Sequence, residues 1–282
     1  MNKNYLKIHA KSFSWAGFFL PKKIYKKCSS LYDFCRTIDD IADQELKLDI
    51  KIKQFKEFKE KFVNKDFNNQ IIKNMYKLID DTGISKKIVF DLFDGVESDL
   101  KEEVIINSKK DLLVYSYRVA GTVGLMMAKI LNVKKQNALK AAINLGIAMQ
   151  LTNIARDVVE DSKKNRKYIN SNFDSIKTTL MITNSFYKSS FLSIGDIPIG
   201  CRFAILVARR VYRQIGNNIL NKENIENYNE SGKIYVSIFG KSFQTILSIF
   251  DFLILLIMSP KEHDKESEHQ IINEEINLNE RI

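Results

Sequence analysis

The chain has 282 residues, of which 44 are Lys or Arg and 34 are Asp or Glu, so its formal net charge is +10. This length can bury a core for one large domain or two ordinary ones, and only 3 Pro and 11 Gly interrupt it, which favours long helices over many short strands. Three cysteines without C-x-x-C spacing argue against a disulfide framework or a zinc site and favour a reducing, cytoplasmic setting.

Apolar residues recur at intervals of three and four through nearly the whole chain, as they do in amphipathic helices. We expect helices within 28–43, 71–81, 111–131, 138–161 and 200–220. No stretch shows sustained alternation, and neither a repeat nor a Gly/Ser/Pro linker divides the chain. The sequence therefore predicts a single all-α domain over residues 1–260, a helical bundle, followed by a disordered polar tail over 261–282.

The most apolar stretch is TILSIFDFLILLIMSP, residues 245–260. Asp251 interrupts it, and it falls short of the ~20 residues that a spanning helix needs. We expect a buried terminal helix here, with a peripheral contact to a membrane surface as the alternative. The apolar run FSWAGFFLP near the N-terminus is short and has no small-residue cleavage site, so we do not expect a signal peptide.

Two stretches place carboxylates one helical turn apart. In QLTNIARDVVED, Asp157 and Asp161 share a stripe about 60° wide with two amide side chains. In LYDFCRTIDDIAD, Asp39 and Asp43 follow Arg36 and Tyr32 at steps of four, three and four.

Such carboxylates need cations. Two of them about 6 Å apart repel by almost 3 kcal/mol at an effective dielectric constant near 20. Mg²⁺ takes one or two protein carboxylates and fills its other positions with water and substrate phosphate oxygens. Arg36 and Arg156 could bind the same phosphates through their guanidinium groups. Facing aspartate pairs therefore predict a site for a diphosphate held through metal ions.

The segments CRTIDDIAD, YRVAGTVGLMMA and LGIAMQLTNIARDVVED resemble the squalene and phytoene synthase family of head-to-head prenyl transferases, and most of all its bacterial phytoene synthases. The resemblance runs from His9 to about Lys241. It implies an isoprenoid synthase fold around a central cavity. It also implies a reaction in which two geranylgeranyl diphosphates form phytoene through prephytoene diphosphate, with release of diphosphate, for carotenoid biosynthesis.

The resemblance also implies residue roles, motif by motif. It assigns binding of Mg²⁺, or of Mn²⁺ in its place, to Asp39, Asp43, Asn153, Asp157 and Asp161. It assigns contact with diphosphate or its waters to Ser12, Arg36, Gln150 and Tyr168, and a place beside the reacting carbons to Tyr32 and Tyr117. GTVGLMMA would supply an apolar cavity wall from Gly121, Gly124, Leu125, Met126 and Met127.

Several alternatives stay open. Phytoene needs a final proton loss, whereas squalene needs hydride from a nicotinamide cofactor; no strand followed by G-x-G-x-x-G is present, and we expect no NADPH. A squalene or dehydrosqualene synthase acting on farnesyl diphosphate is one alternative, and a non-catalytic relative acting as an assembly factor is another. A nucleic-acid binder is disfavoured because the basic residues are scattered among acids.

The chain also departs from the family pattern. Lys233 stands where many members have Arg, Ala10 where many have Ser, and NRKYIN where many have GRLYLP. These changes put one phosphate contact and one turn in doubt, but they remove no expected metal ligand.

Overall fold

The computed structural model describes residues 11–259 and 264–282, with side chains from residue 14 onward. It confirms the all-α fold. The α-helices are α2 (Lys11–Gly17), α3 (Lys22–Asp43), α4 (Leu48–Val63), α5 (Gln70–Thr82), α6 (Lys86–Glu97), α7 (Lys109–Ser116), α8 (Thr122–Ile130), α9 (Gln136–Arg156), α10 (Val158–Lys163), α11 (Phe173–Phe191), α12 (Ile199–Leu220), α13 (Ile225–Glu230), α14 (Ile238–Ile257) and α15 (Glu266–Asn273). A π-helical segment η1 (Tyr117–Gly121) joins α7 to α8, and 3₁₀ segments η2 (Leu192–Asp196) and η3 (Leu278–Glu280) complete the helical elements.

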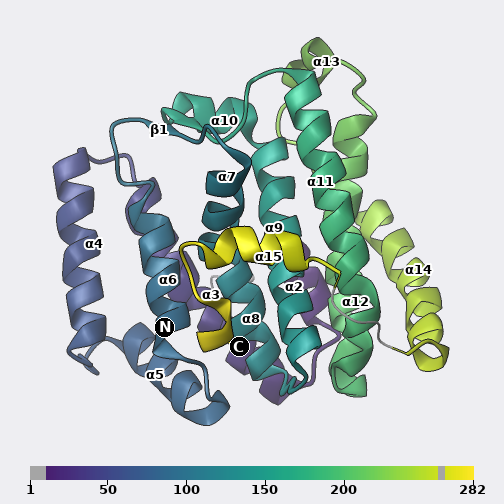
Figure 1. The fold of residues 1–282 in the computed structure, drawn as a ribbon, viewed down its shortest axis with the longest axis horizontal. Helices are drawn as coiled ribbons and strands as arrows, with labels where there is room; N and C mark the ends of the chain where they lie inside the picture. Colours follow the sequence, from purple (N-terminus) through teal and green to yellow (C-terminus); the bar gives the residue numbers. More distant parts are fainter. Residues whose placement is uncertain (1–10, 260–263) are drawn as a thin grey trace.

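Helix α9 lies at the centre of the bundle. It packs against α8, α11, α12 and η1, and Figure 1 shows it surrounded by other helices. Its sequence is apolar or small around the whole circumference, which is the pattern expected of a helix buried on all sides. The amide and acidic residues near its C-terminal end are therefore carried into the interior of the molecule.

Local sequence determines where several helices begin. The side chain of Asn69 accepts hydrogen bonds from the backbone N–H groups of Ile71 and Ile72 at the start of α5, and Gly83 ends that helix with φ = 68°. Asn172, Asn224 and Ser237 cap α11, α13 and α14 in the same way. These side chains satisfy N–H groups that have no partner within the helix.

An aromatic cluster holds α3, α4 and α6 together. Phe34, Phe62 and Phe93 are fully buried, with ring centroids 5.5 to 5.9 Å apart. Aromatic pairs in edge-to-face or tilted arrangements stabilise a core beyond the area that they bury. The cluster fixes the outer side of α3, so that its opposite side is free to border a cavity.

One small sheet lies among the helices of the described chain. Strands β1 (Val104–Ile105) and β2 (Arg166–Lys167) pair in parallel, with Val104 opposite Arg166. The backbone N–H of Val104 donates to the carbonyl of Asn165 at 2.9 Å. The pairing was not expected from sequence. It fixes the loop after α10 close to the end of α3.

The expectation of a buried terminal helix at 245–260 is wrong. Helix α14 lies at one edge of the bundle, opposite α4 (Figure 1), and only four of its side chains are buried. Three of these four, Gln244, Ser248 and Asp251, are polar, and Asp251 pairs with Arg210. An apolar composition predicts a helix buried in the core, but most of the apolar side chains of α14 face outward.

The expectation of a disordered tail is wrong for residues 264–282. Helix α15 lies across α7 and α9 (Figure 1), and buried side chains including Ile272 and Leu278 anchor it to the core. His269 Nε2 lies 2.7 Å from Asn144 Oδ1, and Arg281 forms a bidentate ion pair with Asp91 at 2.9 and 3.0 Å. These few buried groups are widely spaced in a polar sequence, so composition alone gave no sign of them.

Candidate active site

A polar cavity of about 210 Å³ brings the two acidic segments together. It is lined by Asp39 and Asp43 from α3 and by Asn153, Asp157 and Asp161 from the end of α9 and from α10. Helix α9 ends at Arg156, yet the backbone N–H of Asp161 still donates to the carbonyl of Asp157 at 2.8 Å. The one-turn spacing therefore survives the break between the two helices.

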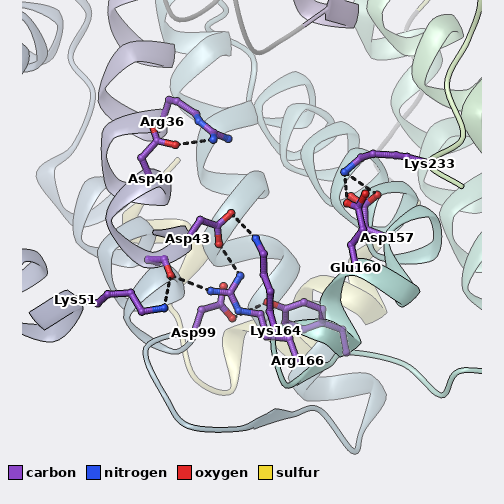
Figure 2. A network of polar contacts seen from close by, with 12 residues as sticks. Arg36, Asp40, Asp43, Lys51, Asp99, Asp157, Glu160, Lys164, Arg166 and Lys233 are labelled. Atoms are coloured by element: carbon purple, nitrogen blue, oxygen red, sulfur yellow. Dashed lines mark hydrogen bonds and ion pairs between the residues drawn. The ribbon is translucent and has the colours of Figure 1, made fainter. Parts of the chain in front are cut away.

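On the α3 side, the two carboxylates differ in environment. Burial, reinforced by Asp43 and Asp99 and only partly opposed by Arg36, raises the pKa of Asp39 to about 7. Burial would also raise the pKa of Asp43, but Arg166 at 2.8 Å and Lys164 at 3.2 Å outweigh it and lower that pKa. Figure 2 shows Asp43 between these two cations.

On the facing side, Asp157 is held by two cations. Arg156 binds it in bidentate fashion at 2.7 and 2.6 Å, and Lys233 Nζ lies 3.3 Å from it while also pairing with Glu160 (Figure 2). Lys233, which replaces an arginine of the family pattern, thus contacts an acidic residue of the site. Burial and the charge of Asp157 raise the pKa of Asp161 to about 7.

Three residues that the sequence did not single out as a group close the polar cavity. The hydroxyls of Tyr115 and Tyr168 each donate to the buried carboxylate of Asp99 at 2.8 Å, and their rings stack with centroids 4.7 Å apart. Burial raises the pKa of Asp99 despite Arg166 and the two hydroxyls. Of this group only Tyr168 was predicted. Asp99 lies in the loop after α6 and Arg166 in strand β2, so the positions of both depend on tertiary contacts.

A second, apolar cavity of about 380 Å³ adjoins the polar one. The two share one wall, formed by Arg36, Asp39, Val119, Gln150 and Asn153. The apolar cavity continues between α2, α3, α8, α9 and α12, where small residues such as Ala141, Ala142 and Ala208 leave room. This arrangement suits an amphiphile with an anionic head and a long hydrocarbon chain.

Most of the predicted site residues line these cavities. Tyr32 borders the apolar cavity, Arg156 and Tyr168 border the polar one, and Arg36 and Gln150 border both. Ser12 belongs to α2, but its side chain lies outside the described residues.

The structure places Tyr117 away from both cavities, in contrast to its expected position beside the reacting carbons. Tyr117 lines neither cavity; it is fully buried in the core, where its hydroxyl donates to Asp91 at 3.0 Å. The face that borders the cavities carries Tyr115, Val119 and Val123, which follow at intervals of four through the π-helical segment. Tyr117, two residues after Tyr115, points the other way. The interval of four to Val119 is the signal that could have identified Tyr115.

The predicted apolar wall in GTVGLMMA is present in part. Gly124 and Met127 line the apolar cavity, whereas Leu125 and Met126 are fully buried in the core. A Cβ at Gly124 would lie 2.2 Å from the carbonyl oxygen of Ala142, so glycine permits the close approach of α8 to α9 here.

The donor set fits Mg²⁺ bound together with a diphosphate. Within 11–259 and 264–282 no three His, Cys, Asp or Glu side chains cluster closely enough to hold a metal ion by themselves. Mg²⁺ does not require such a cluster, because phosphate oxygens and water complete its shell. Asn153 Oδ1 is buried without a hydrogen-bond partner, and Asp39 and Asp161 lie among other carboxylates. These are oxygen ligands that a cation would satisfy.

The fold and the paired cavities define a helical isoprenoid synthase. The solved structure of a dehydrosqualene synthase with bound ligand superposes with a TM-score of 0.75 at 26% identity, covering 87% of this chain and 93% of that one. A squalene synthase from Alicyclobacillus acidocaldarius shares the fold, with a TM-score of 0.67 at 15% identity over 79% of this chain and 91% of that one.

A family model described as squalene/phytoene synthase matches residues 6–173, more than half of the chain. The 15-cis-phytoene synthase of Pantoea ananas is 27% identical over 248 residues, covering 74% of this chain and 78% of that protein. A phytoene synthase of Pseudescherichia vulneris is 34% identical over 155 residues, 48% of this chain and half the length of that relative. The chain belongs to the squalene/phytoene synthase family, whose members are prenyltransferase-type enzymes acting on prenyl diphosphates.

Proposed function

We propose that the protein is a phytoene synthase that joins two geranylgeranyl diphosphates head to head, through prephytoene diphosphate, to give phytoene and diphosphate for carotenoid biosynthesis. The observation that carries this proposal is that a polar, acid-lined cavity adjoins an apolar cavity and shares lining residues with it. Relatives named as phytoene synthases match the chain, among them the Pantoea ananas protein.

The chain's own residues perform distinct tasks in this reaction. The diphosphate occupies the polar cavity, where Arg36 and Arg156 lie within the lining and offer guanidinium donors. Mg²⁺ held by Asp39, Asp43, Asn153, Asp157 and Asp161 would neutralise the leaving group and so assist its departure. The prenyl chains occupy the apolar cavity, whose Ala, Val and Met side chains exclude the water that would quench an allylic cation.

A second candidate is a dehydrosqualene-type synthase that takes two farnesyl diphosphates. The 4,4'-diapophytoene synthase of Staphylococcus haemolyticus is 27% identical over 251 residues, 86% of this chain and 84% of that protein, and the dehydrosqualene synthase structure superposes well. Both candidates use the same polar cavity and differ in the chain length that the apolar cavity accepts.

The deciding experiment is incubation of the purified protein with Mg²⁺ and either the C15 or the C20 diphosphate, with and without NADPH, followed by hydrocarbon analysis. We expect phytoene from the C20 substrate without NADPH. A C30 product from the C15 substrate alone would establish the second candidate, and squalene formed only with NADPH would refute both. Absence of diphosphate release from either substrate would instead indicate a non-catalytic relative.

A further inference from the structure

Helix α14 has the reverse of the polarity expected of a water-exposed helix. Its inward stripe carries Gln244, Ser248 and Asp251, whereas its outward side carries large apolar residues. The exposed ones are Ile238, Phe239, Phe243, Ile246, Ile249, Phe250, Leu253, Ile254, Leu256 and Ile257. Phe239 and Ile257, the most exposed, are 88% and 86% accessible. Water does not stabilise such a face, so something apolar covers it.

The inward polar side chains are satisfied within the protein. Gln244 donates to Gln214 at 3.0 Å, and Asp251 binds Arg210 in bidentate fashion at 2.6 and 2.7 Å. These contacts fix α14 along α12 and determine which side faces outward. Among the described residues α14 is the one helix long and apolar enough to cross a membrane by length and composition. Its packing along α12 instead keeps it flat against the bundle, with its outer side available to an interface.

The width of the apolar face favours lipid over a protein partner. At 100° per residue the exposed large apolar side chains cover an arc of roughly 160° along the whole helix. The outer arc carries no charged residue: Asp251 points inward, and Lys241 lies on the polar side. Protein interfaces carry a polar rim and about one hydrogen bond per 100–200 Å², whereas the most exposed residues of this helix are all apolar. Residues 1–10, MNKNYLKIHA, contain too few large apolar side chains to cover it.

Helix α2 contacts α14, and exposed aromatic and basic residues follow α2 in the chain. Trp15 Nε1 donates to Thr245 of α14 at 3.0 Å, and the adjoining Phe18 is 75% exposed. Lys22, Lys23 and Lys26, whose side chains are exposed, follow in the first turns of α3. Apolar and aromatic groups beside lysines are the combination that binds an anionic lipid surface.

The opposite side of α2 borders the apolar cavity. Ala16, Gly17 and Leu20 line it, and α12, which packs against both α2 and α14, supplies Ala204 and Ala208 to the same cavity. The segment 16–20 thus borders the apolar cavity next to Trp15, which contacts α14. We propose that the outer face of α14, together with Phe18 and the lysines after it, docks on an anionic lipid bilayer and brings the α2 wall of the cavity to the membrane. This docking depends on no particular choice of prenyl substrate.

The test is co-sedimentation with vesicles containing phosphatidylglycerol, using the wild-type protein and the triple variant Phe239→Ser, Phe243→Ser, Phe250→Ser. We expect the wild type to pellet and the variant to lose at least about tenfold in partition coefficient, because three exposed rings no longer enter the lipid. The matched control is Val63→Ser with Met181→Ser, which removes exposed apolar side chains from α4 and α11. This control should pellet like the wild type.

A second measurement needs no variant. The chain has a single tryptophan, and Trp15 is hydrogen-bonded to α14, so its fluorescence should be quenched by vesicles made with brominated acyl chains. The proposal is overturned if the wild type stays in the supernatant, if the triple variant binds as well as the wild type, or if bound protein shows no Trp15 quenching. It is equally overturned if light scattering shows a dimer that the triple variant converts to monomer while vesicle binding is absent from both. Prenyl diphosphate turnover is assayed separately, so loss of docking and loss of the proposed activity are distinguishable.

Discussion

At the scale of single residues, the site is defined by carboxylates whose charges are unequally compensated. Asp43 and Asp157 each contact two cationic side chains, whereas Asp39 and Asp161 have pKa values raised to about 7 by burial and by neighbouring acids. The uncompensated carboxylates and the unpartnered Asn153 Oδ1 mark where a cation would bind. These uncompensated charges should lower the free energy of unfolding of the metal-free protein.

We predict that Asp39→Asn stabilises the metal-free protein at high pH. A carboxyl whose pKa is raised in the folded state contributes most stability below its unfolded pKa near 4, and this contribution is lost as the pH rises toward 7. Asparagine cannot ionise, so the variant should gain about 1–3 kcal/mol at pH 8 and almost nothing near pH 4. Urea unfolding in EDTA at both pH values measures this. An equal gain at both would show that the charge of Asp39 is not responsible.

Asp157→Asn should abolish turnover and leave the fold intact. The substitution keeps the shape of the side chain but removes a charge that lines the polar cavity, the proposed diphosphate site, so we expect kcat/KM to fall at least about a hundredfold. Steady-state kinetics with circular dichroism measure this. Glu160→Gln is the control, because Glu160 also pairs with Lys233 but does not line the polar cavity. Full activity of the Asp157 variant would remove this residue from the site.

The two tyrosines of the YSY segment should behave differently. Tyr115→Phe removes a hydroxyl at the polar cavity and should lower kcat, and because this hydroxyl also donates to Asp99 the free energy of unfolding should fall by about 1 kcal/mol. Tyr117→Phe leaves Asp91 without one buried hydrogen bond and should lower the free energy of unfolding by about 1 kcal/mol with little change in kcat. Kinetics and urea unfolding of both variants separate the roles. The reverse pattern would mean that the faces have been assigned wrongly.

At the scale of elements, α8 and η1 pack closely against α9, and residues of all three line the apolar cavity. A Cβ at Gly146 would lie 2.2 Å from the carbonyl oxygen of Ala120, which is backbone and cannot rotate away. Gly146→Ala must therefore push the helices apart.

We expect Gly146→Ala to destabilise the protein by about 1–3 kcal/mol and to lower activity, because Ala120 borders the apolar cavity. Thermal unfolding together with kinetics checks this. Gly200→Ala is the matched control: its Cβ would meet nothing within 4 Å, so stability should change little. Unchanged stability in Gly146→Ala would show that the helices can separate freely.

At the scale of the whole molecule, binding at the polar cavity should stabilise the fold by linkage. Mg²⁺ with inorganic diphosphate at about 100 times the dissociation constant would contribute about 2.7 kcal/mol, which corresponds to a rise in Tm of roughly 5 °C or more. Differential scanning fluorimetry measures this without any turnover. The Asp157→Asn variant should show a smaller rise, and an equal rise would place the binding elsewhere.

Sequence predicted the acidic pairs because Asp39 and Asp43 lie one turn apart within α3, and because Asp157 and Asp161 keep the same one-turn spacing across the junction of α9 and α10. It could not predict Asp99 or Arg166, since these reach the site through loops and the β1–β2 pairing. The sequence wrongly predicted that α14 is buried, because apolar composition does not distinguish a helix covered by protein from a helix on the surface. It missed the packed tail because a few buried residues, such as His269 and Ile272, decide its position.

The shared wall between the cavities has a practical consequence for engineering. Arg36 and Gln150 lie at this boundary, whereas Ala138, Ser190 and Ile194 line the apolar cavity only. Larger or smaller side chains at those three positions would change the length of hydrocarbon that fits and leave the acidic residues untouched. For the proposed reaction, product size should therefore be open to redesign at residues that do not line the polar cavity.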